Sequence, residues 1–88
     1  MLYTIVLFRE PEGGYTVTVP ALQGCVTYGE NLTSALDMAR EAVQLYLESL
    51  HDDGLPSPPD MPAVTVALDD QQEAMVLRLE IREAEPVA

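Results

Sequence analysis

The N-terminal third of the chain has the hydrophobic pattern of three β-strands. Residues Leu2 to Phe8, LYTIVLF, are apolar or β-branched at nearly every position, as in a strand covered on both faces. From Tyr15 to Val19 apolar residues and threonines alternate, as in a strand with one buried face. Pro20 offers no N–H to a ladder and ends this strand, and a short third strand is expected from Cys25 to Tyr28. The pattern therefore predicts an antiparallel three-strand meander.

A long amphipathic helix is predicted after the third strand. Asn31 is a favoured N-cap residue, and apolar residues recur behind it at spacings of three and four. This series comprises Leu32, Ala35, Leu36, Ala39, Val43, Tyr46, Leu47 and Leu50. Gly54 is expected to end the helix, with His51 in the last turn, where the helix dipole is negative. One face of this helix should pack on the sheet.

The remaining residues predict an extended connector and a further strand. The segment after the helix contains Pro56, Pro58, Pro59 and Pro62, which exclude both a helix and a regular ladder. A short edge strand over Ala63 to Leu68 is an open alternative, and a surer strand runs from Ala74 to Arg82. The element order is then β-β-β-α-(β)-β. We expect a single α+β domain over residues 1–88, with one helix packed on one face of the sheet.

Charge narrows the possible partners. Fifteen acidic residues stand against four arginines and no lysine, giving a net charge of −11. Because phosphate backbones repel such a surface, we expect no direct binding of nucleic acid. A basic partner protein is electrostatically favourable, although an acidic surface also serves solubility alone. A single cysteine, short apolar runs and an N-terminus without a basic leader favour a cytoplasmic protein with no membrane span.

No combination of residues predicts catalysis. The acidic residues fall mostly in expected loops, and Glu80 lies between Arg78 and Arg82 in a strand. His51 has no second histidine or cysteine nearby, and Cys25 has the neighbours of a small buried core residue. There is also no glycine-rich phosphate loop. We therefore expect no enzyme, no cofactor and no metal.

An uncovered sheet face indicates a partner. The strand Leu2 to Phe8 is apolar on both sides, whereas one helix covers only one of them. The other face should meet a second protein or another copy of this chain, as a homodimer or homotetramer. The candidate partner-contact residues are Thr16, Thr18, Arg78, Glu80 and Arg82.

The corner between the second strand and the helix resembles the HicB antitoxin family. It reads Gly14-Tyr15, then Val19-Pro20-x-Leu22-x-Gly24-Cys25-x-Thr27-x-Gly29, followed by a capped helix with Ala35-Leu36 and Glu41-Ala42. The helix tail Leu45-Tyr46-Leu47-Glu48 and its proline-rich connector fit the same family. The resemblance covers roughly residues 2–59. It implies an incomplete ribonuclease-H-like fold that lacks that fold's catalytic carboxylates.

The same resemblance implies a function. A HicB antitoxin binds and masks HicA, a small basic mRNA-cleaving toxin with a double-stranded-RNA-binding-like fold. Many family members also carry a C-terminal DNA-binding domain, and we expect none in this chain. Two alternatives remain open: an orphan homo-oligomeric scaffold or regulator without a toxin, and a residual nuclease of ribonuclease-H type.

Overall fold

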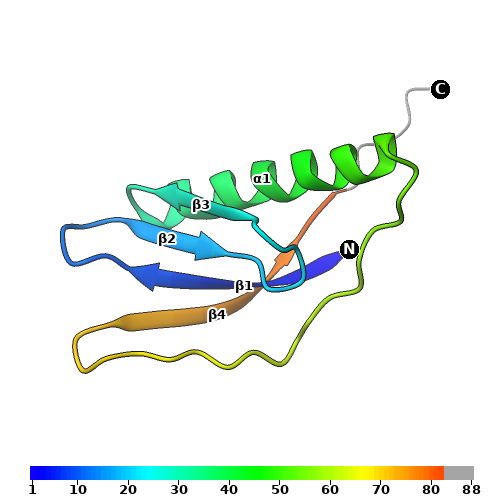
Figure 1. Ribbon diagram of the computed structural model, residues 1–88. Helices are drawn as coiled ribbons and strands as arrows, with labels where there is room; N and C mark the ends of the chain where they lie inside the picture. The colour runs from blue at the N-terminus through cyan, green and yellow to red at the C-terminus, as the bar shows by residue number, and fades with distance from the viewer. Residues whose placement is uncertain (83–88) are drawn as a thin grey trace.

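The protein folds into one antiparallel sheet with a long helix across it (Figure 1). The computed structural model describes residues 1–82. Four strands and one helix follow in the order β1 (Leu2–Arg9), β2 (Tyr15–Thr18), β3 (Val26–Gly29), α1 (Leu32–Asp52) and β4 (Glu73–Glu80). The strands are arranged β3-β2-β1-β4 across the sheet, and all neighbours are antiparallel. The predicted α+β fold, with its meander and single helix, is confirmed.

The strand β1 pairs with β2 through a tight turn and with β4 on its other side. The loop between β1 and β2 closes with Gly13 and Gly14 at φ values of 104° and 84°, in the region that favours glycine. Phe8 pairs with Thr16 on β2 and with Ala74 on β4, so β1 lies in the interior of the sheet. Because β1 has neighbours on both sides, its continuous apolar pattern is that of a central strand.

The helix begins as its sequence predicts and then packs closely on the sheet. The side chain of Asn31 accepts a hydrogen bond from the Ser34 N–H at 2.8 Å, which satisfies one free donor of the first turn. The buried face of α1 comprises Ala35, Ala39, Val43 and Leu47. At the β3–α1 junction a Cβ on Gly29 would overlap the backbone of Ala35. The absence of a side chain at position 29 therefore allows the close approach of helix and strand.

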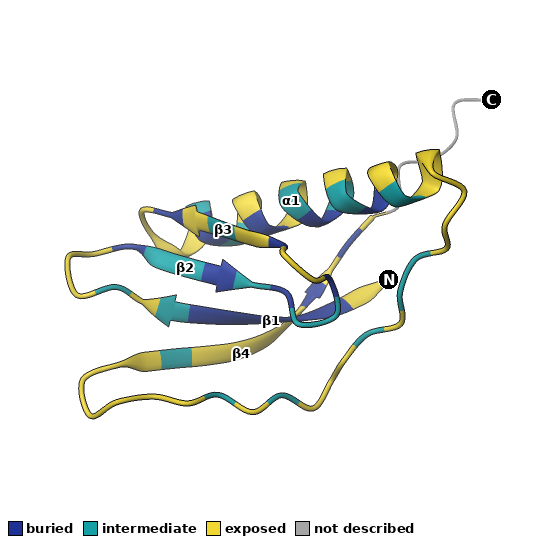
Figure 2. Cartoon of the chain, in the orientation of Figure 1, coloured by how far each residue is buried: buried dark blue, intermediate teal, exposed yellow. Residues whose placement is uncertain are grey.

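One side of the sheet forms the main core with α1. The buried cluster joins Tyr3, Ile5 and Leu7 of β1 to Val17 of β2 and to the helix residues named above. Figure 2 shows the buried positions concentrated between the helix and the sheet, whereas β4 is largely exposed. In β4, Leu79 is buried but Met75 and Leu77, which share its face, are each 37% exposed. The helix packs mainly against β3, at the opposite edge of the sheet from β4. The part of β4 that contains Met75 and Leu77 is therefore left uncovered.

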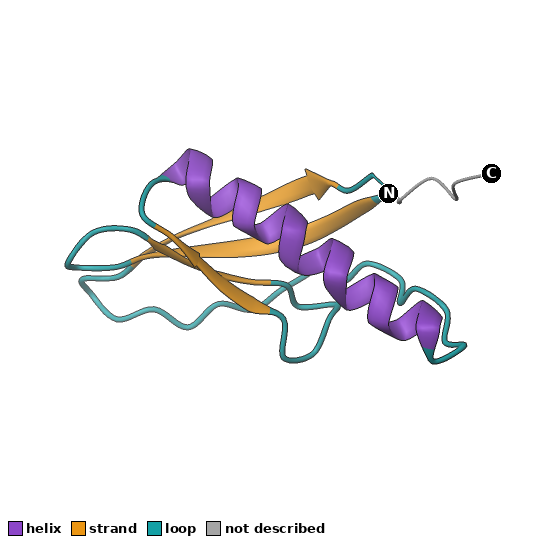
Figure 3. Cartoon of the chain, turned by 90° about the horizontal axis from the view of Figure 1, so that it is seen from above, coloured by secondary structure: helices purple, strands orange, loops and turns teal. Residues whose placement is uncertain are grey.

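The segment 53–72, here called the connector, returns along the sheet before β4 begins. Figures 1 and 3 show it running from the end of α1 back to the start of β4 as a long irregular segment. The expected extended connector is confirmed, but Ala63 to Leu68 forms no strand. This part lies across a face of the sheet and not along an edge, so its backbone meets no ladder partner. Val64 and Val66 are nevertheless half-buried while their neighbours are exposed, as the alternating sequence implies.

Candidate partner-binding surface

The sheet face away from α1 gathers most of the predicted partner-contact residues. We call it the connector face, and its side chains are Leu2, Thr4, Val6, Phe8, Thr16, Thr18, Val26, Tyr28, Ala74, Val76, Arg78 and Glu80. Thr18 lies in one row with Val26, Val6 and Val76 across all four strands. Thr16 lies in the next row, and Arg78 and Glu80 lie further along β4. The structure thus brings four of the five candidates onto one face.

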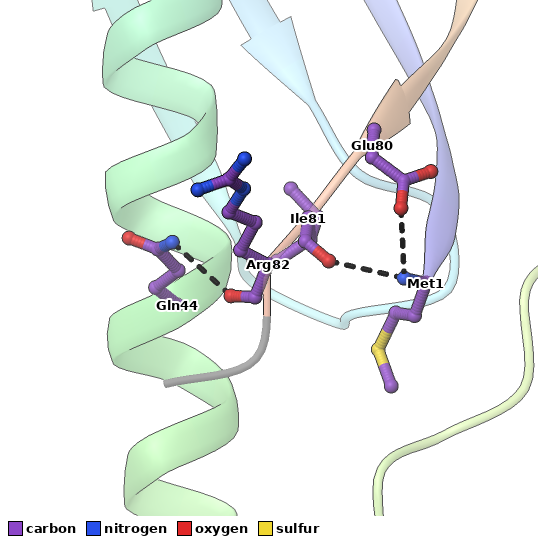
Figure 4. Close-up of polar contacts among 5 residues, drawn as sticks. All are labelled: Met1, Gln44, Glu80, Ile81 and Arg82. Atoms are coloured by element: carbon purple, nitrogen blue, oxygen red, sulfur yellow. Dashed lines mark hydrogen bonds and ion pairs between the residues drawn. The ribbon is translucent and has the colours of Figure 1, made fainter. Parts of the chain in front are cut away.

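The fifth candidate, Arg82, lies elsewhere. It follows β4, and its carbonyl accepts a hydrogen bond from the Gln44 side chain of α1 at 3.2 Å. Glu80, two residues earlier, instead points toward the start of β1, where its carboxylate is 3.3 Å from the N-terminal amine of Met1 (Figure 4). The backbone of Arg82 is therefore held against the helix and away from the connector face.

The connector is held against β1 by Asp60. Its carboxylate accepts the backbone N–H of Thr4 at 2.8 Å and the Thr4 hydroxyl at 2.9 Å. Thr4 is 1% exposed, and its N–H points to the side where β2 has already ended before Pro20. Nearby, the hydroxyl of Tyr3 donates to the carbonyl of Pro58 at 2.6 Å. Asp60 thus replaces a missing ladder acceptor at the end of β2.

The environment of Asp60 favours its ionised form. Partial burial opposes ionisation, but the two hydrogen bonds from Thr4 and one from the Met61 N–H outweigh it. The positive charge of Arg78, which pairs with Thr4 across β1 and β4, acts in the same direction. Together these interactions lower the pKa of Asp60 below its usual value.

Between the connector and the sheet lies an open groove of about 470 Å³. Its lining includes Val6, Phe8 and Thr18 from the sheet, together with Pro20, Met61 and residues 63–67 of the connector. Val6 is only 3% exposed although α1 lies on the other side of the sheet. The second apolar side of β1 is therefore partly covered by the chain itself, which the hydrophobic pattern did not predict.

Exposed apolar and acidic groups surround this groove. Val26 and Tyr28 of β3 and Val76 of β4 are each about half exposed. Glu10 accepts a hydrogen bond from the Thr16 hydroxyl at 2.7 Å, which places a carboxylate beside the face. The connector face therefore combines apolar contact area with negative charge.

Among residues 1–82 the structure assembles no metal centre. Within them no group of three His, Cys, Asp or Glu side chains is placed to hold a metal ion. Burial raises the pKa of the Cys25 thiol, which disfavours the nucleophilic thiolate. His51 lies 2.8 Å from the Ser57 hydroxyl at the start of the connector. Within the described residues, α1 has no stretch apolar enough to span a membrane.

Comparison with solved structures defines the class of the fold. A chain of the HicA3 and HicB3 toxin–antitoxin complex superposes with a TM-score of 0.68 at 25% identity, over 93% of this chain and 99% of that chain. The Burkholderia pseudomallei antitoxin HicB superposes with a TM-score of 0.69 at 25% identity, over 92% of this chain and 63% of that chain. The protein is thus an α+β domain with the fold of HicB antitoxins.

Sequence comparison identifies the family. A profile of the family described as HicB_like antitoxin of bacterial toxin-antitoxin system matches residues 3–84. A UPF0150 protein of Thermoplasma acidophilum is 41% identical over 58 residues, covering 64% of this chain and 84% of that protein. Another, from Synechocystis, is 39% identical over 56 residues, covering 64% of this chain and 71% of that protein. The chain belongs to the HicB-like antitoxin family, as the G-C-x-T-x-G corner indicated.

Proposed function

We propose that this protein is a non-enzymatic cytoplasmic antitoxin that binds a HicA-type ribonuclease toxin and masks its active site. The observation that carries the proposal is the family match over residues 3–84. Similarity at 25% identity to a chain of a toxin–antitoxin complex supports a toxin as the partner. The family of the chain, and not an assembled site, is therefore the main support.

The charge of the chain suits such a partner. A net charge of −11 attracts a basic protein at long range and repels RNA that competes for the same surface. In this proposal the antitoxin presents carboxylates where the toxin would bind phosphates. Binding should consequently weaken as the salt concentration rises.

We assign toxin contact to the connector face. Thr16, Thr18, Arg78 and Glu80 lie there, beside exposed apolar residues that a partner can bury. Arg82 is a peripheral contact in this assignment, because its backbone is tied to α1. The connector, which crosses this face, would form part of the same binding surface.

The second candidate function is an orphan homo-oligomeric scaffold or regulator, as a dimer or tetramer without a toxin. The exposed apolar residues of β4 favour self-association, and self-association is compatible with toxin binding as well. The two functions differ in their neighbours. An antitoxin is expected beside a gene for a small basic protein with a catalytic histidine, whereas a scaffold requires none.

The proposal is tested by mixing the purified chain with a basic HicA-type protein, first the product of a neighbouring gene. Size-exclusion chromatography should show a stable complex, and an RNA-cleavage assay should show silenced cleavage. The variants Glu80→Lys and Glu48→Lys make a matched pair, since both reverse an exposed charge, one on the connector face and one on the outer helix.

Weaker binding for Glu80→Lys alone would support the assigned face. Weaker binding for Glu48→Lys alone would place the toxin on the helix. Failure to bind a toxin with proven activity would reject the antitoxin function and favour the scaffold. Cleavage of RNA by the chain itself with Mg²⁺ or Mn²⁺ would instead reveal the residual nuclease.

A further inference from the structure

We propose that the free edge of β4 pairs with β4 of a second copy, which would join two sheets into one continuous antiparallel sheet centred on Val76. This inference specifies an interface for the self-association proposed above and is independent of toxin binding. The two contacts use different groups of β4, because toxin contact is assigned to side chains of the connector face and self-pairing to the backbone of the sheet edge.

The hydrogen-bond pattern shows which backbone groups are free. Met1 and Ile81 exchange both hydrogen bonds, with the Ile81 N–H donating to Met1 at 2.7 Å and the Met1 amine to Ile81 at 3.0 Å. Antiparallel pairs alternate, so Leu79, Leu77, Met75 and Glu73 direct their peptide groups toward β1. Ala74, Val76, Arg78 and Glu80 therefore direct theirs outward, where residues 1–82 offer no backbone partner.

This edge has few of the features that usually prevent pairing. Edge strands are commonly shortened, bulged or interrupted by proline and lysine. β4 has eight residues, contains neither proline nor lysine, and pairs with β1 in continuous register. The other edge, β3, has only four residues and continues directly into α1. Pairing with a second copy would therefore satisfy the free backbone groups of the longer edge strand, β4.

Charge and register favour a second copy as the occupant. Between Ala74 and Leu79 the only charged residue is Arg78, although the chain carries a net charge of −11. Two acidic copies therefore meet little like-charge repulsion along this segment. A two-fold axis at Val76 pairs Val76 with itself and Met75 with Leu77, the three apolar residues that β4 exposes.

The remaining residues tolerate this register. Arg78 meets Ala74 of the second copy and Glu73 meets Leu79, so no like charges lie opposite each other. A two-fold axis perpendicular to the sheet places both helices on one side and both connectors on the other. Because α1 packs mainly against β3 and least against β4, the helices lie mostly away from the new contact.

The test introduces one cysteine at a time at the positions of β4 whose peptide groups point outward. Val76→Cys should form an intermolecular disulfide under mild oxidation, because two-fold pairing brings the two Cα atoms within disulfide range. Arg78→Cys is the matched control on the same strand and face: alone it should not cross-link, but mixed with Ala74→Cys it should. The unmodified chain controls for Cys25, which is buried and cannot contribute.

A second pair of variants separates pairing from folding. Val76→Pro removes an outward N–H and should convert a sedimenting dimer into a monomer of half the mass with an unchanged circular dichroism spectrum. Leu77→Pro removes an N–H bonded to β1 and should unfold the strand. A monomeric wild-type chain, a dimer without a Val76→Cys disulfide, or equal cross-linking by Arg78→Cys alone would overturn the proposal. The result does not depend on whether the chain binds a toxin, because the cross-linking and sedimentation experiments contain the chain alone.

Discussion

Asp60 completes the hydrogen bonding of Thr4, a residue 56 positions earlier in the chain. One carboxylate oxygen accepts the backbone N–H and the other accepts the hydroxyl, at 2.8 and 2.9 Å. The donor is buried and lies where the ladder between β1 and β2 has ended. The Asp60 side chain, together with the Tyr3 hydroxyl that donates to Pro58, therefore fixes the connector to the central strand, and Asp60 covers the open part of that strand's edge.

Removing this carboxylate should destabilise the protein. Asp60→Ala leaves two buried donors of Thr4 without an acceptor, and such losses cost about 1–3 kcal/mol each. We expect a lower free energy of unfolding in urea and faster proteolysis within the connector. Asp69→Ala, a similar change in the exposed turn before β4, is the control and should have a smaller effect. Equal effects of the two substitutions would show that the connector is not fixed by Asp60.

The same carboxylate should make stability depend on pH. Its folded-state pKa lies below its unfolded value, so it stabilises the fold at pH above the unfolded value. That contribution is lost as the pH falls from the unfolded pKa, about 3.9, toward the lower folded pKa. The stability difference between wild type and Asp60→Asn should therefore shrink on acidification. A constant difference from neutral pH to about pH 3 would contradict this assignment.

A methyl group at position 29 should separate the helix from the sheet. Gly29→Ala places a Cβ against the backbone of Ala35, and neither segment can move without disturbing the core. Overpacking of this kind costs about 1–3 kcal/mol. We expect a lower melting temperature by calorimetry, whereas Glu30→Ala at the exposed neighbouring position should change little.

The N-cap should contribute measurably to the helix. Asn31→Ala removes the acceptor for the Ser34 N–H and should cost about 0.5–2 kcal/mol of unfolding free energy. Asn31→Ser retains a capping oxygen and should lose much less. If both variants are equally destabilised in chemical denaturation, the helix start does not depend on this hydrogen bond.

Most local structure could be predicted because it depends on neighbouring residues. The alternation in Tyr15–Val19, the stop at Pro20 and the cap at Asn31 act over a few residues, and all appear in the structure. The predicted strand over Ala74 to Arg82 is present as Glu73–Glu80. The family resemblance rested on the same local features and is confirmed.

The placement of the connector could not be predicted in this way. Ala63 to Leu68 has the alternation of a strand, but alternation does not distinguish an edge from a segment lying across a face. The function of Asp60 depends on a donor far away in the sequence, and its only local signal is an isolated carboxylate among prolines. The contact residues proposed for the partner also stay predictions, since only their positions are now defined.

The central position of β1 has a consequence for synthesis at the ribosome. Its neighbour β2 follows immediately, but its other neighbour, β4, emerges only after the helix and the whole connector. Until then one side of the most apolar strand has no partner, and Thr4 lacks Asp60 as well. The sheet can therefore close only when β4, which follows the helix and the connector in the chain, becomes available to pair with β1.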